Sequence, residues 1–319
     1  MAPTAAGETL TLVVRDMRWE AEDVLRLGLE RPDGAPLPTW EPGAHIDVRL
    51  SNGVERQYSL CSEPADATRW EIAVLREPVS RGGSRFIHSE LRPGAPVEVR
   101  GPVNTFPLQD AEEYLFVAGG IGITAVIPMI EAVARAGKSY RVAYLGRSRA
   151  RMAFLSHPLL SGPRVSVVAA DEQGRLDLDA WLASPASGTV VYACGPARLL
   201  DSLEEAATAW PGGLLRLERF QPKVFAEVAD GSVFDVEARR SGLRVTVESG
   251  CSILEMLEQA GVPVPSSCLE GVCGTCETTI LDGEAEHRDS ILVPDERAAN
   301  ETMMICVSRS KLPTLVLDI

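Results

Sequence analysis

Three cysteines lie within nine positions in the C-terminal third of the chain, and a fourth follows thirty residues later. They are Cys268, Cys273, Cys276 and Cys306. Four thiolates at the spacing C-x4-C-x2-C…C are the ligand set of a plant-type [2Fe–2S] cluster. Gly271 and Gly274 give the loop the backbone freedom to turn its amides toward the sulfurs. A four-cysteine zinc site is the alternative, but zinc ligands usually come in paired short knuckles, whereas here three share one loop.

A glycine-rich turn separates the apolar segment 114–118 from a segment of helical apolar periodicity at 125–136. Its candidate functional residues are Gly119, Gly120, Gly122 and Thr124. Backbone amides at the start of a helix can hold a pyrophosphate, although a purely structural strand-to-helix turn fits equally well. A second tight turn, Cys194-Gly195-Pro196, follows another apolar strand and is a further place where the backbone can approach a nicotinamide.

The residues that follow the apolar segment 141–145 bear on the choice between NADH and NADPH. An acidic residue that binds the ribose is expected there, but Leu145 is followed by glycine, Arg147, serine and Arg149. Arginines at this place can accept the 2′-phosphate of NADPH, or they can be solvated loop charges. The residue pattern leaves both alternatives open.

Two short segments within the first hundred residues combine groups that suit a flavin. Arg56, Tyr58 and Ser59 offer a forked cation for a phosphate, a flat ring and a hydroxyl group. A glycine pair and a serine, which can form a nest of amides, come later in the chain: Gly82, Gly83 and Ser84. Taken separately, each group can equally belong to an ordinary strand face or hairpin turn.

The elements that position these groups follow three different patterns, and 319 residues exceed the size of one hydrophobic core. Short alternating apolar and polar runs with turn residues between them predict an antiparallel β-barrel over residues 1–108. Continuous apolar strands alternating with helical segments predict a parallel α/β sheet over 109–222. A hairpin and a helix with Ser252 as N-cap and Glu255 three residues on predict a small α+β domain over 223–319.

The charge is strongly negative and unevenly distributed. The chain has 45 acidic and 31 basic residues, and from Glu227 to the end there are 17 acidic and 7 basic residues. Such a surface disfavours nucleic acid and suits a basic patch on a protein partner, or it serves solubility alone. The N-terminal segment lacks a signal-peptide pattern, no apolar stretch is long enough to span a bilayer, and seven cysteines fit a reducing compartment. We therefore expect a cytoplasmic protein without a membrane or nucleic-acid partner.

Taken in order, these motifs resemble the phthalate dioxygenase reductase family, which lies within the ferredoxin–NADP reductase superfamily and includes vanillate O-demethylase reductases. The motifs are R-x-Y-S-L from Arg56, G-G-S from Gly82, G-G-I-G-I-T from Gly119, C-G-P from Cys194 and the cysteine motif from Cys268. The resemblance covers nearly the whole chain. Five motifs in the same order make a chance resemblance very improbable.

The resemblance implies FMN in the barrel, NADH in the α/β domain, and a β-grasp ferredoxin domain that carries the [2Fe–2S] cluster. Family members mostly use NADH, while the arginine argument leaves NADPH open. The flavin-binding residues that the resemblance implies are Arg56, Tyr58, Ser59, Gly82, Gly83, Ser84, Thr124 and Phe220. The nucleotide-binding residues that it implies are Gly119, Gly120, Gly122, Thr124, Arg147, Cys194, Gly195 and Pro196.

A nicotinamide delivers two electrons as hydride, whereas a [2Fe–2S] cluster accepts one electron at a time, so a flavin between them must split the pair. This chemistry needs no catalytic side chain. The resemblance implies the NADH-dependent reductase of a multicomponent oxygenase, which serves a separate Rieske-type oxygenase that hydroxylates aromatic rings or removes O-methyl groups. One alternative sends the same electrons to a cytochrome P450 or another metalloenzyme. A more remote alternative is a non-catalytic zinc-binding protein.

Overall fold

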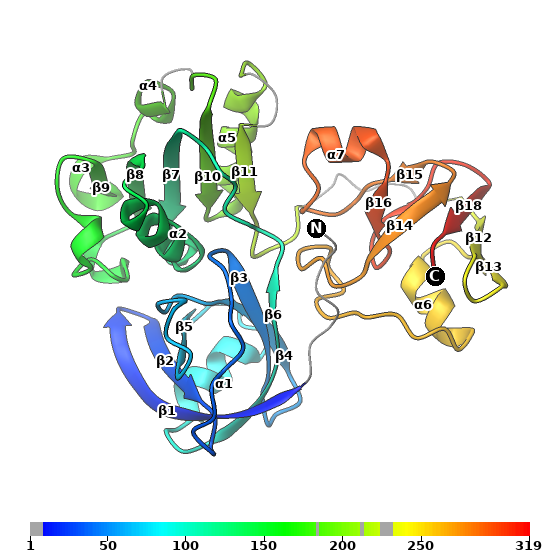
Figure 1. Cartoon of the computed structure of the whole chain (residues 1–319), viewed down its shortest axis with the longest axis horizontal. Helices are drawn as coiled ribbons and strands as arrows, with labels where there is room; N and C mark the ends of the chain where they lie inside the picture. Colours follow the sequence, from blue (N-terminus) through cyan, green and yellow to red (C-terminus); the bar gives the residue numbers. More distant parts are fainter. Residues whose placement is uncertain (1–8, 183–184, 211–213, 224–231) are drawn as a thin grey trace. The chain divides into compact units, whose positions relative to one another are not determined.

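The computed structural model describes residues 9–182, 185–210, 214–223 and 232–319 (Figure 1). Residues 1–8, where a signal peptide would begin, and 224–231, where the acidic stretch begins, lie outside the described residues. The chain divides into two compact units, Met1–Glu218 and Arg219–Ile319. Within the described residues, no helix is long and apolar enough to cross a membrane.

The first part of the N-terminal unit is a curled six-stranded antiparallel sheet with the strand order β4-β3-β6-β1-β2-β5. Its strands are β1 Leu10–Ala21, β2 Val24–Glu30, β3 Ala44–Arg49, β4 Glu55–Ser59, β5 Trp70–Leu75 and β6 Pro96–Asn104. Alternate residues of β1, such as Leu12 and Val14, are buried, as a period of two requires. Helix α1, Gly83–Ser89, adds Ile87 to the same core.

The second part of this unit is a five-stranded parallel sheet with the order β11-β10-β7-β8-β9. Its strands are β7 Glu113–Gly119, β8 Ser139–Gly146, β9 Val165–Ala169, β10 Thr189–Cys194 and β11 Leu215–Glu218. The helices are α2 Ile123–Arg135, α3 Ala170–Gln173, α4 Leu178–Leu182 and α5 Ala197–Ala207, with single 3-10 turns at Gly120–Gly122, Arg149–Arg151 and Pro158–Leu160. Parallel pairing places the carboxyl ends of β7, β8 and β10 at one edge of the sheet.

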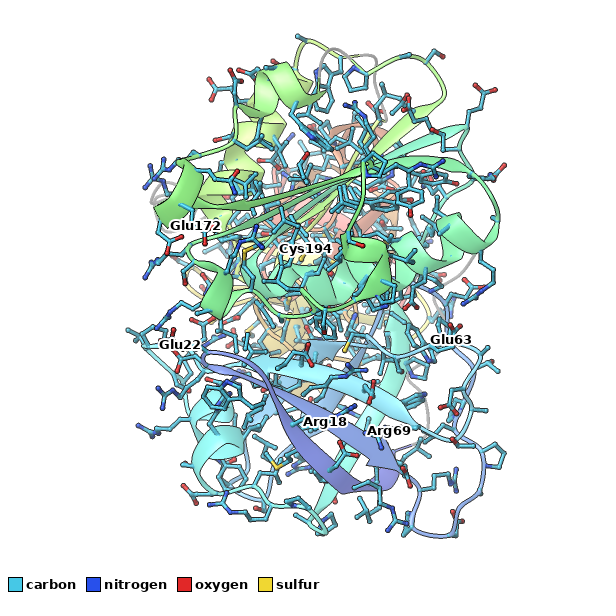
Figure 2. The ribbon with its side chains drawn as sticks, turned by 90° about the vertical axis from the view of Figure 1, so that its left-hand side faces the viewer. Arg18, Glu22, Glu63, Arg69, Glu172 and Cys194 are labelled. Carbon is cyan, nitrogen blue, oxygen red and sulfur yellow. The ribbon has the colours of Figure 1, made fainter. Side chains whose placement is uncertain are left out.

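Contacts between the two parts of the N-terminal unit include ion pairs and a cation–π contact. Arg151 pairs with Glu22 at 2.8 Å, and Arg135 pairs with Glu63 at 2.5 Å. Figure 2 labels the two glutamates. The guanidinium of Arg26, on β2, lies 5.2 Å from the centre of the Phe154 ring. The barrel and the parallel sheet are therefore joined by side chains from several elements.

The C-terminal unit is a mixed sheet with the order β13-β12-β18-β14-β16, plus the two-stranded β15-β17. Its strands are β12 Phe234–Ala238, β13 Leu243–Val247, β14 Glu277–Asp282, β15 Ala285–Glu286, β16 Thr302–Met304, β17 Arg309–Ser310 and β18 Thr314–Leu317. Its helices are α6 Ile253–Gln259 and α7 Pro294–Ala299. Ser252 and Glu255 form the predicted capping box of α6. The predicted fold class, with its barrel, parallel sheet and β-grasp domain, is confirmed.

Candidate cofactor and electron-transfer sites

The structure brings the two proposed flavin segments of the barrel together. The Arg56 Nη2 atom donates a hydrogen bond to the Arg81 carbonyl oxygen at 3.0 Å. A Cβ added at Gly83 would lie 2.7 Å from the Arg56 Cγ atom, so only glycine lets the arginine stem lie against the start of α1. Gly82 precedes this helix with a φ of 99°, which a residue with a side chain rarely adopts. Strand β4 and the start of α1 thus form one cradle.

Ser80, which the sequence analysis missed, is hydrogen-bonded within this cradle. Its Oγ atom accepts hydrogen bonds from the Gly82 and Arg85 amides at 3.2 and 3.3 Å. The Ser84 hydroxyl donates to the same oxygen at 3.1 Å and accepts from the Glu77 amide at 3.2 Å. The serine oxygen therefore receives donors of the kind that a phosphate oxygen needs. The role of Ser80 is visible only in the folded loop, because a serine two residues before a glycine pair is not a distinctive sequence pattern.

Tyr58 and Ser59 end strand β4 in different environments. The Ser59 side chain is buried, and its Oγ atom has no hydrogen-bond partner among the described residues. Tyr58 packs against the barrel core, and burial raises the pKa of its phenol. Buried polar atoms of native proteins are nearly always hydrogen-bonded, so an unpartnered hydroxyl fits a site that a ligand completes. The residues present therefore fit a flavin whose ring heteroatom bonds to Ser59.

The glycines of the two predicted nucleotide turns are explained by close backbone packing. A Cβ at Gly122 would overlap the Cys194 carbonyl group and lie 2.8 Å from the Gly195 nitrogen. A Cβ at Gly119 would lie 2.7 Å from the Pro196 Cδ atom. Gly120 differs, because a Cβ there would meet nothing within 4 Å, and its φ is 54°. The two turns thus interlock, and Gly120 faces open space where a ligand can approach.

Thr124 and the arginines after β8 lie at the same carboxyl edge of the sheet. Thr124 is 2% exposed, and its hydroxyl donates to the Ile121 carbonyl at 2.9 Å, so the hydroxyl is engaged within its own turn. Arg147 is exposed, and its carbonyl oxygen accepts a hydrogen bond from the Asp171 amide at 3.1 Å. Arg149 forms an ion pair with Glu172 at 3.1 Å. Acidic residues after β9 thus lie beside the arginines after β8.

An acidic residue near the second turn, with one buried oxygen atom, was not anticipated from the sequence. Cys194 and Glu218 face each other in the register of β10 and β11, and Cys194 lies inside the sheet (Figure 2). Burial raises the pKa of Glu218 to about 8, partly offset by a hydrogen bond with Cys194, whose own pKa burial also raises. The Glu218 Oε2 atom is buried without a partner among the described residues. Phe220, two residues further on, is 39% exposed.

The four proposed cluster ligands come together in the C-terminal unit. Hydrogen bonds with the Cys273 and Cys306 thiols lower the pKa of Cys268, and a hydrogen bond with Cys306 lowers that of Cys276. The Cys268 sulfur also accepts hydrogen bonds from the amides of Glu270 at 3.3 Å and Val272 at 3.5 Å. The predicted orientation of loop amides toward a sulfur is therefore present at Cys268.

The backbone of this loop uses left-handed conformations at several positions. Gly271 and Gly274 have φ values of 69° and 75°, and Leu269 has a φ of 57°. Within the described residues, no three histidine, cysteine, aspartate or glutamate side chains surround one ion position.

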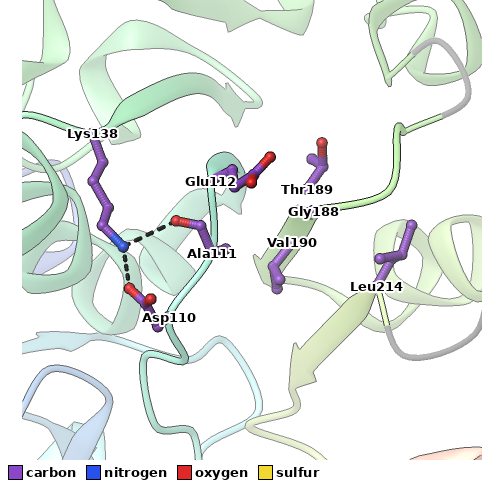
Figure 3. Close-up of a pocket in the computed structure, with 8 residues that line it drawn as sticks. All are labelled: Asp110, Ala111, Glu112, Lys138, Gly188, Thr189, Val190 and Leu214. Atoms are coloured by element: carbon purple, nitrogen blue, oxygen red, sulfur yellow. Dashed lines mark hydrogen bonds and ion pairs between the residues drawn. The ribbon is translucent and has the colours of Figure 1, made fainter.

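A pocket of about 480 Å³ lies at the opposite edge of the parallel sheet (Figure 3). It is lined by residues that include Asp110, Lys138 and Thr189, where β10 begins. Lys138 donates a hydrogen bond to the Ala111 carbonyl at 3.0 Å beside it. The glycine turns follow the carboxyl ends of the strands, so this pocket does not belong to the proposed nucleotide site.

A curled antiparallel sheet with an arginine and glycine cradle, a parallel sheet with two glycine turns and four converging cysteines are together typical of an iron–sulfur flavoprotein reductase. Residues 236–311 match the family model of the 2Fe-2S iron-sulfur cluster binding domain. The chain is 41% identical to phenoxybenzoate dioxygenase subunit beta of Ectopseudomonas oleovorans over the full length of both proteins. The crystal structure of phthalate dioxygenase reductase is 36% identical, with 98% of each chain covered and a TM-score of 0.69. The chain belongs to the phthalate dioxygenase reductase family.

A larger protein contains a module of the same kind. An intact type IV self-sufficient cytochrome P450 monooxygenase is 45% identical over 98% of this chain, with a TM-score of 0.91, and the match spans 41% of that monooxygenase. The expected enzyme class, an oxidoreductase that acts as an oxygenase reductase component, is confirmed. The expected cofactors, FMN, NADH and a [2Fe–2S] cluster, agree with the family. The family match thus favours the iron–sulfur cluster over zinc.

Proposed function

We propose that this chain takes electrons from NADH through FMN and a [2Fe–2S] cluster to a separate terminal oxygenase. The observation that carries the proposal is the convergence of three cysteine thiols of one loop with the distant Cys306, with two backbone amides directed at Cys268. The same chain also has the proposed flavin cradle and the interlocked nucleotide turns. It therefore has candidate sites for every cofactor needed to accept a hydride and to pass on single electrons.

The proposed site residues follow the sequence expectation, and so do the domain limits 1–108, 109–222 and 223–319. Arg56 and Ser84 hold the FMN phosphate, and Tyr58 and Ser59 bind its ring. The other proposed flavin residues are Gly82, Gly83, Thr124 and Phe220. The proposed nucleotide residues are Gly119, Gly120, Gly122, Thr124, Arg147, Cys194, Gly195 and Pro196. The proposed cluster ligands are Cys268, Cys273, Cys276 and Cys306.

The protein side chains contribute binding and orientation to the chemistry. When bound, FMN accepts a hydride and releases its electrons singly. Arg56 supplies a positive charge beside the amides at the start of α1, and Ser59 supplies a buried hydroxyl. The barrel core behind Tyr58 keeps water from one side of the ring site. Cofactor loading that survives gel filtration is the expected result of this arrangement.

Ion pairing at the sheet edge supports NADH over NADPH. Arg149 is paired with Glu172, and the Asp171 amide bonds to the Arg147 carbonyl, so two acids lie next to the two arginines. Glu172 neutralises Arg149, which leaves less positive charge for a 2′-phosphate. We expect a larger kcat/KM for NADH than for NADPH in steady-state assays, and a preference for NADPH would contradict this assignment.

The partner in this proposal is a Rieske-type oxygenase that docks at the acidic ferredoxin domain. The count of 17 acidic against 7 basic residues from Glu227 onward supports a basic docking surface on that partner. The second candidate is a cytochrome P450, which the similarity to the self-sufficient monooxygenase favours. Reconstitution with purified oxygenases of both classes discriminates between them, because only the true partner class turns over its substrate at the expense of NADH.

The purified protein itself offers the first test. We expect the visible spectrum of a flavin plus a [2Fe–2S] cluster, and NADH-driven reduction of a one-electron acceptor such as cytochrome c. A colourless protein, or one that does not reduce cytochrome c with NADH, would overturn the proposed function.

A further inference from the structure

Asp289 carries a carboxylate inside the C-terminal unit that is 0% exposed. Its Oδ1 atom accepts hydrogen bonds from the Ile291 amide at 2.9 Å and the Leu292 amide at 2.8 Å. Its Oδ2 atom is also buried, and it has no hydrogen-bond partner among the described residues. A buried carboxylate lowers stability unless its charge is compensated, so half of this group lacks compensation from hydrogen bonds.

An arginine and a histidine lie near the Asp289 carboxylate. An Arg297 nitrogen lies 3.8 Å from the Asp289 Oδ1 atom, and the guanidinium also donates to the Asp289 carbonyl at 2.6 Å and the Leu292 carbonyl at 2.9 Å. The His287 Nδ1 atom lies 3.9 Å from the Oδ2 atom, and burial lowers the pKa of the ring. His287 is therefore neutral near pH 7, and Arg297 supplies the compensating positive charge.

The same segment lies directly against the cysteine loop. Gly271, between the first two proposed ligands, has no space for a side chain: a Cβ there would lie 3.1 Å from the Asp289 Cα atom and 2.6 Å from a Val307 methyl carbon. The Ser290 amide donates to the Gly271 carbonyl at 2.8 Å. Val307 follows the last proposed ligand in the chain. The backbone and Cβ atom of Asp289 thus pack against the loop that carries three of the thiols.

We propose that Asp289 is a positioning residue that fixes the cysteine loop and sets the reduction potential of the [2Fe–2S] cluster. Reduction adds one negative charge to the cluster, and a fixed negative charge nearby in a medium of low dielectric constant opposes that addition. Asp289 therefore lowers the midpoint potential and makes the reduced cluster a stronger donor to the partner. Arg297 has the opposite effect. This inference rests on the cluster ligation proposed above.

The test is a redox titration of the full-length, loaded protein followed by electron paramagnetic resonance of the reduced cluster. Asp289→Asn keeps an oxygen that accepts from the Ile291 and Leu292 amides but removes the charge, so we expect a shift of the cluster midpoint to more positive potential with the flavin potential unchanged. Asp295→Asn is the matched control, because it removes one exposed negative charge on α7. A loaded Asp289→Asn protein whose cluster potential equals that of wild type would overturn the inference.

A second variant distinguishes an electrostatic effect on the cluster potential from damage to the fold of the cysteine loop. Arg297→Gln removes the compensating cation, and we expect the cluster midpoint to move to more negative potential, opposite in sign to Asp289→Asn. Potential shifts of the same sign in both variants, or loss of the cluster in both, would overturn the proposed effect of Asp289 on the cluster potential. Asp289 and Arg297 would then serve only the folding of the cysteine loop. Wild-type protein without a [2Fe–2S] spectrum would refute the proposed ligation instead, so the two failures are distinguishable.

Discussion

The Ser59 hydroxyl is buried at the end of β4 and has no partner among the described residues. A buried polar atom left unpaired costs about 1–3 kcal/mol, so nearly all buried polar atoms of native proteins have a hydrogen-bond partner. Arg56 lies on the same strand with its stem against Gly83. At the scale of single residues, these two features support the proposal that the barrel binds a ligand with an anionic group and a polar ring.

Replacing Arg56 by glutamine should weaken FMN binding. A charge-assisted hydrogen bond to phosphate contributes about 1.5–3 kcal/mol, so we expect the dissociation constant to rise roughly 10- to 100-fold. Titration of apoprotein with FMN, followed by quenching of flavin fluorescence, measures this. Arg49→Gln, on the exposed surface of β3, is the control and should bind FMN as wild type does. Equal affinity in the Arg56 variant would remove this residue from the site.

Glu218 should make stability depend on pH. Burial raises the pKa of its carboxyl from 4.5 to about 8, so between these values the folded state holds a proton that the unfolded state has lost. The stabilising contribution is complete below the unfolded pKa and is lost as the pH rises toward about 8. Glu218→Gln removes this dependence, and we expect the difference in free energy of unfolding between wild type and variant to change by roughly 1–3 kcal/mol across the window.

Urea unfolding of both proteins at about pH 5, 6.5 and 8 checks this expectation. Wild type should lose stability relative to Glu218→Gln as the pH rises. Glu205→Gln, on the exposed side of α5, should keep the slope of wild type. Parallel slopes for wild type and Glu218→Gln would show that the carboxyl at the end of β11 is already charged at low pH.

At the scale of elements, two strand-to-helix turns depend on each other. The turn between β7 and α2 packs its glycines against the turn between β10 and α5, so neither turn keeps its shape alone. Gly119 and Gly122 are required by this backbone contact, and Gly120 by its positive φ of 54°. The nucleotide edge of the sheet is therefore one structural unit built from two distant segments.

Gly122→Ala should disrupt this edge, because its Cβ would overlap the Cys194 carbonyl. We expect a loss of roughly 2–4 kcal/mol in stability and a weaker affinity for NADH, with FMN binding retained. Gly120→Ala, where the new Cβ meets open space, should cost only about 1 kcal/mol for its left-handed backbone. Thermal unfolding and NADH titration measure both effects. Equal losses in the two variants would argue against the interlocked turns.

Elements with local signals could be predicted from the sequence. The capping box of Ser252 and Glu255, the hairpin of β12 and β13, and the β7 strand before its glycine turn all depend on residues a few positions apart. Ser80 and Glu218 could not be predicted, because their roles arise from a folded loop and from strand register. The acids after β9 were missed for the same reason, since Glu172 meets Arg149 only across the sheet edge.

At the scale of the whole molecule, negative charge is concentrated toward the C-terminus. From Glu227 onward acidic residues outnumber basic ones by 17 to 7. A field of this kind speeds encounter with a basic partner and is screened beyond a Debye length of about 8–10 Å at physiological salt. Electron transfer to the partner should therefore depend on ionic strength, whereas hydride uptake from NADH takes place within one chain and its cofactors.

Salt should slow partner reduction more than hydride uptake. Between low salt and about 0.5 M salt we expect the rate of oxygenase reduction to fall roughly tenfold, because steering is screened. Reduction of the flavin by NADH, measured by stopped-flow absorbance, should change much less. The same sensitivity in both steps would contradict docking at the acidic ferredoxin domain.

The central claim is that electrons leave this reductase through a cluster held by four cysteines. Cys273→Ser tests it most directly, with Cys251→Ser as the control outside the motif. We expect the Cys273 variant to keep FMN and NADH-driven reduction of ferricyanide but to lose at least tenfold in the rate of cytochrome c reduction, while the control behaves as wild type. Unchanged cytochrome c reduction by Cys273→Ser would contradict the account.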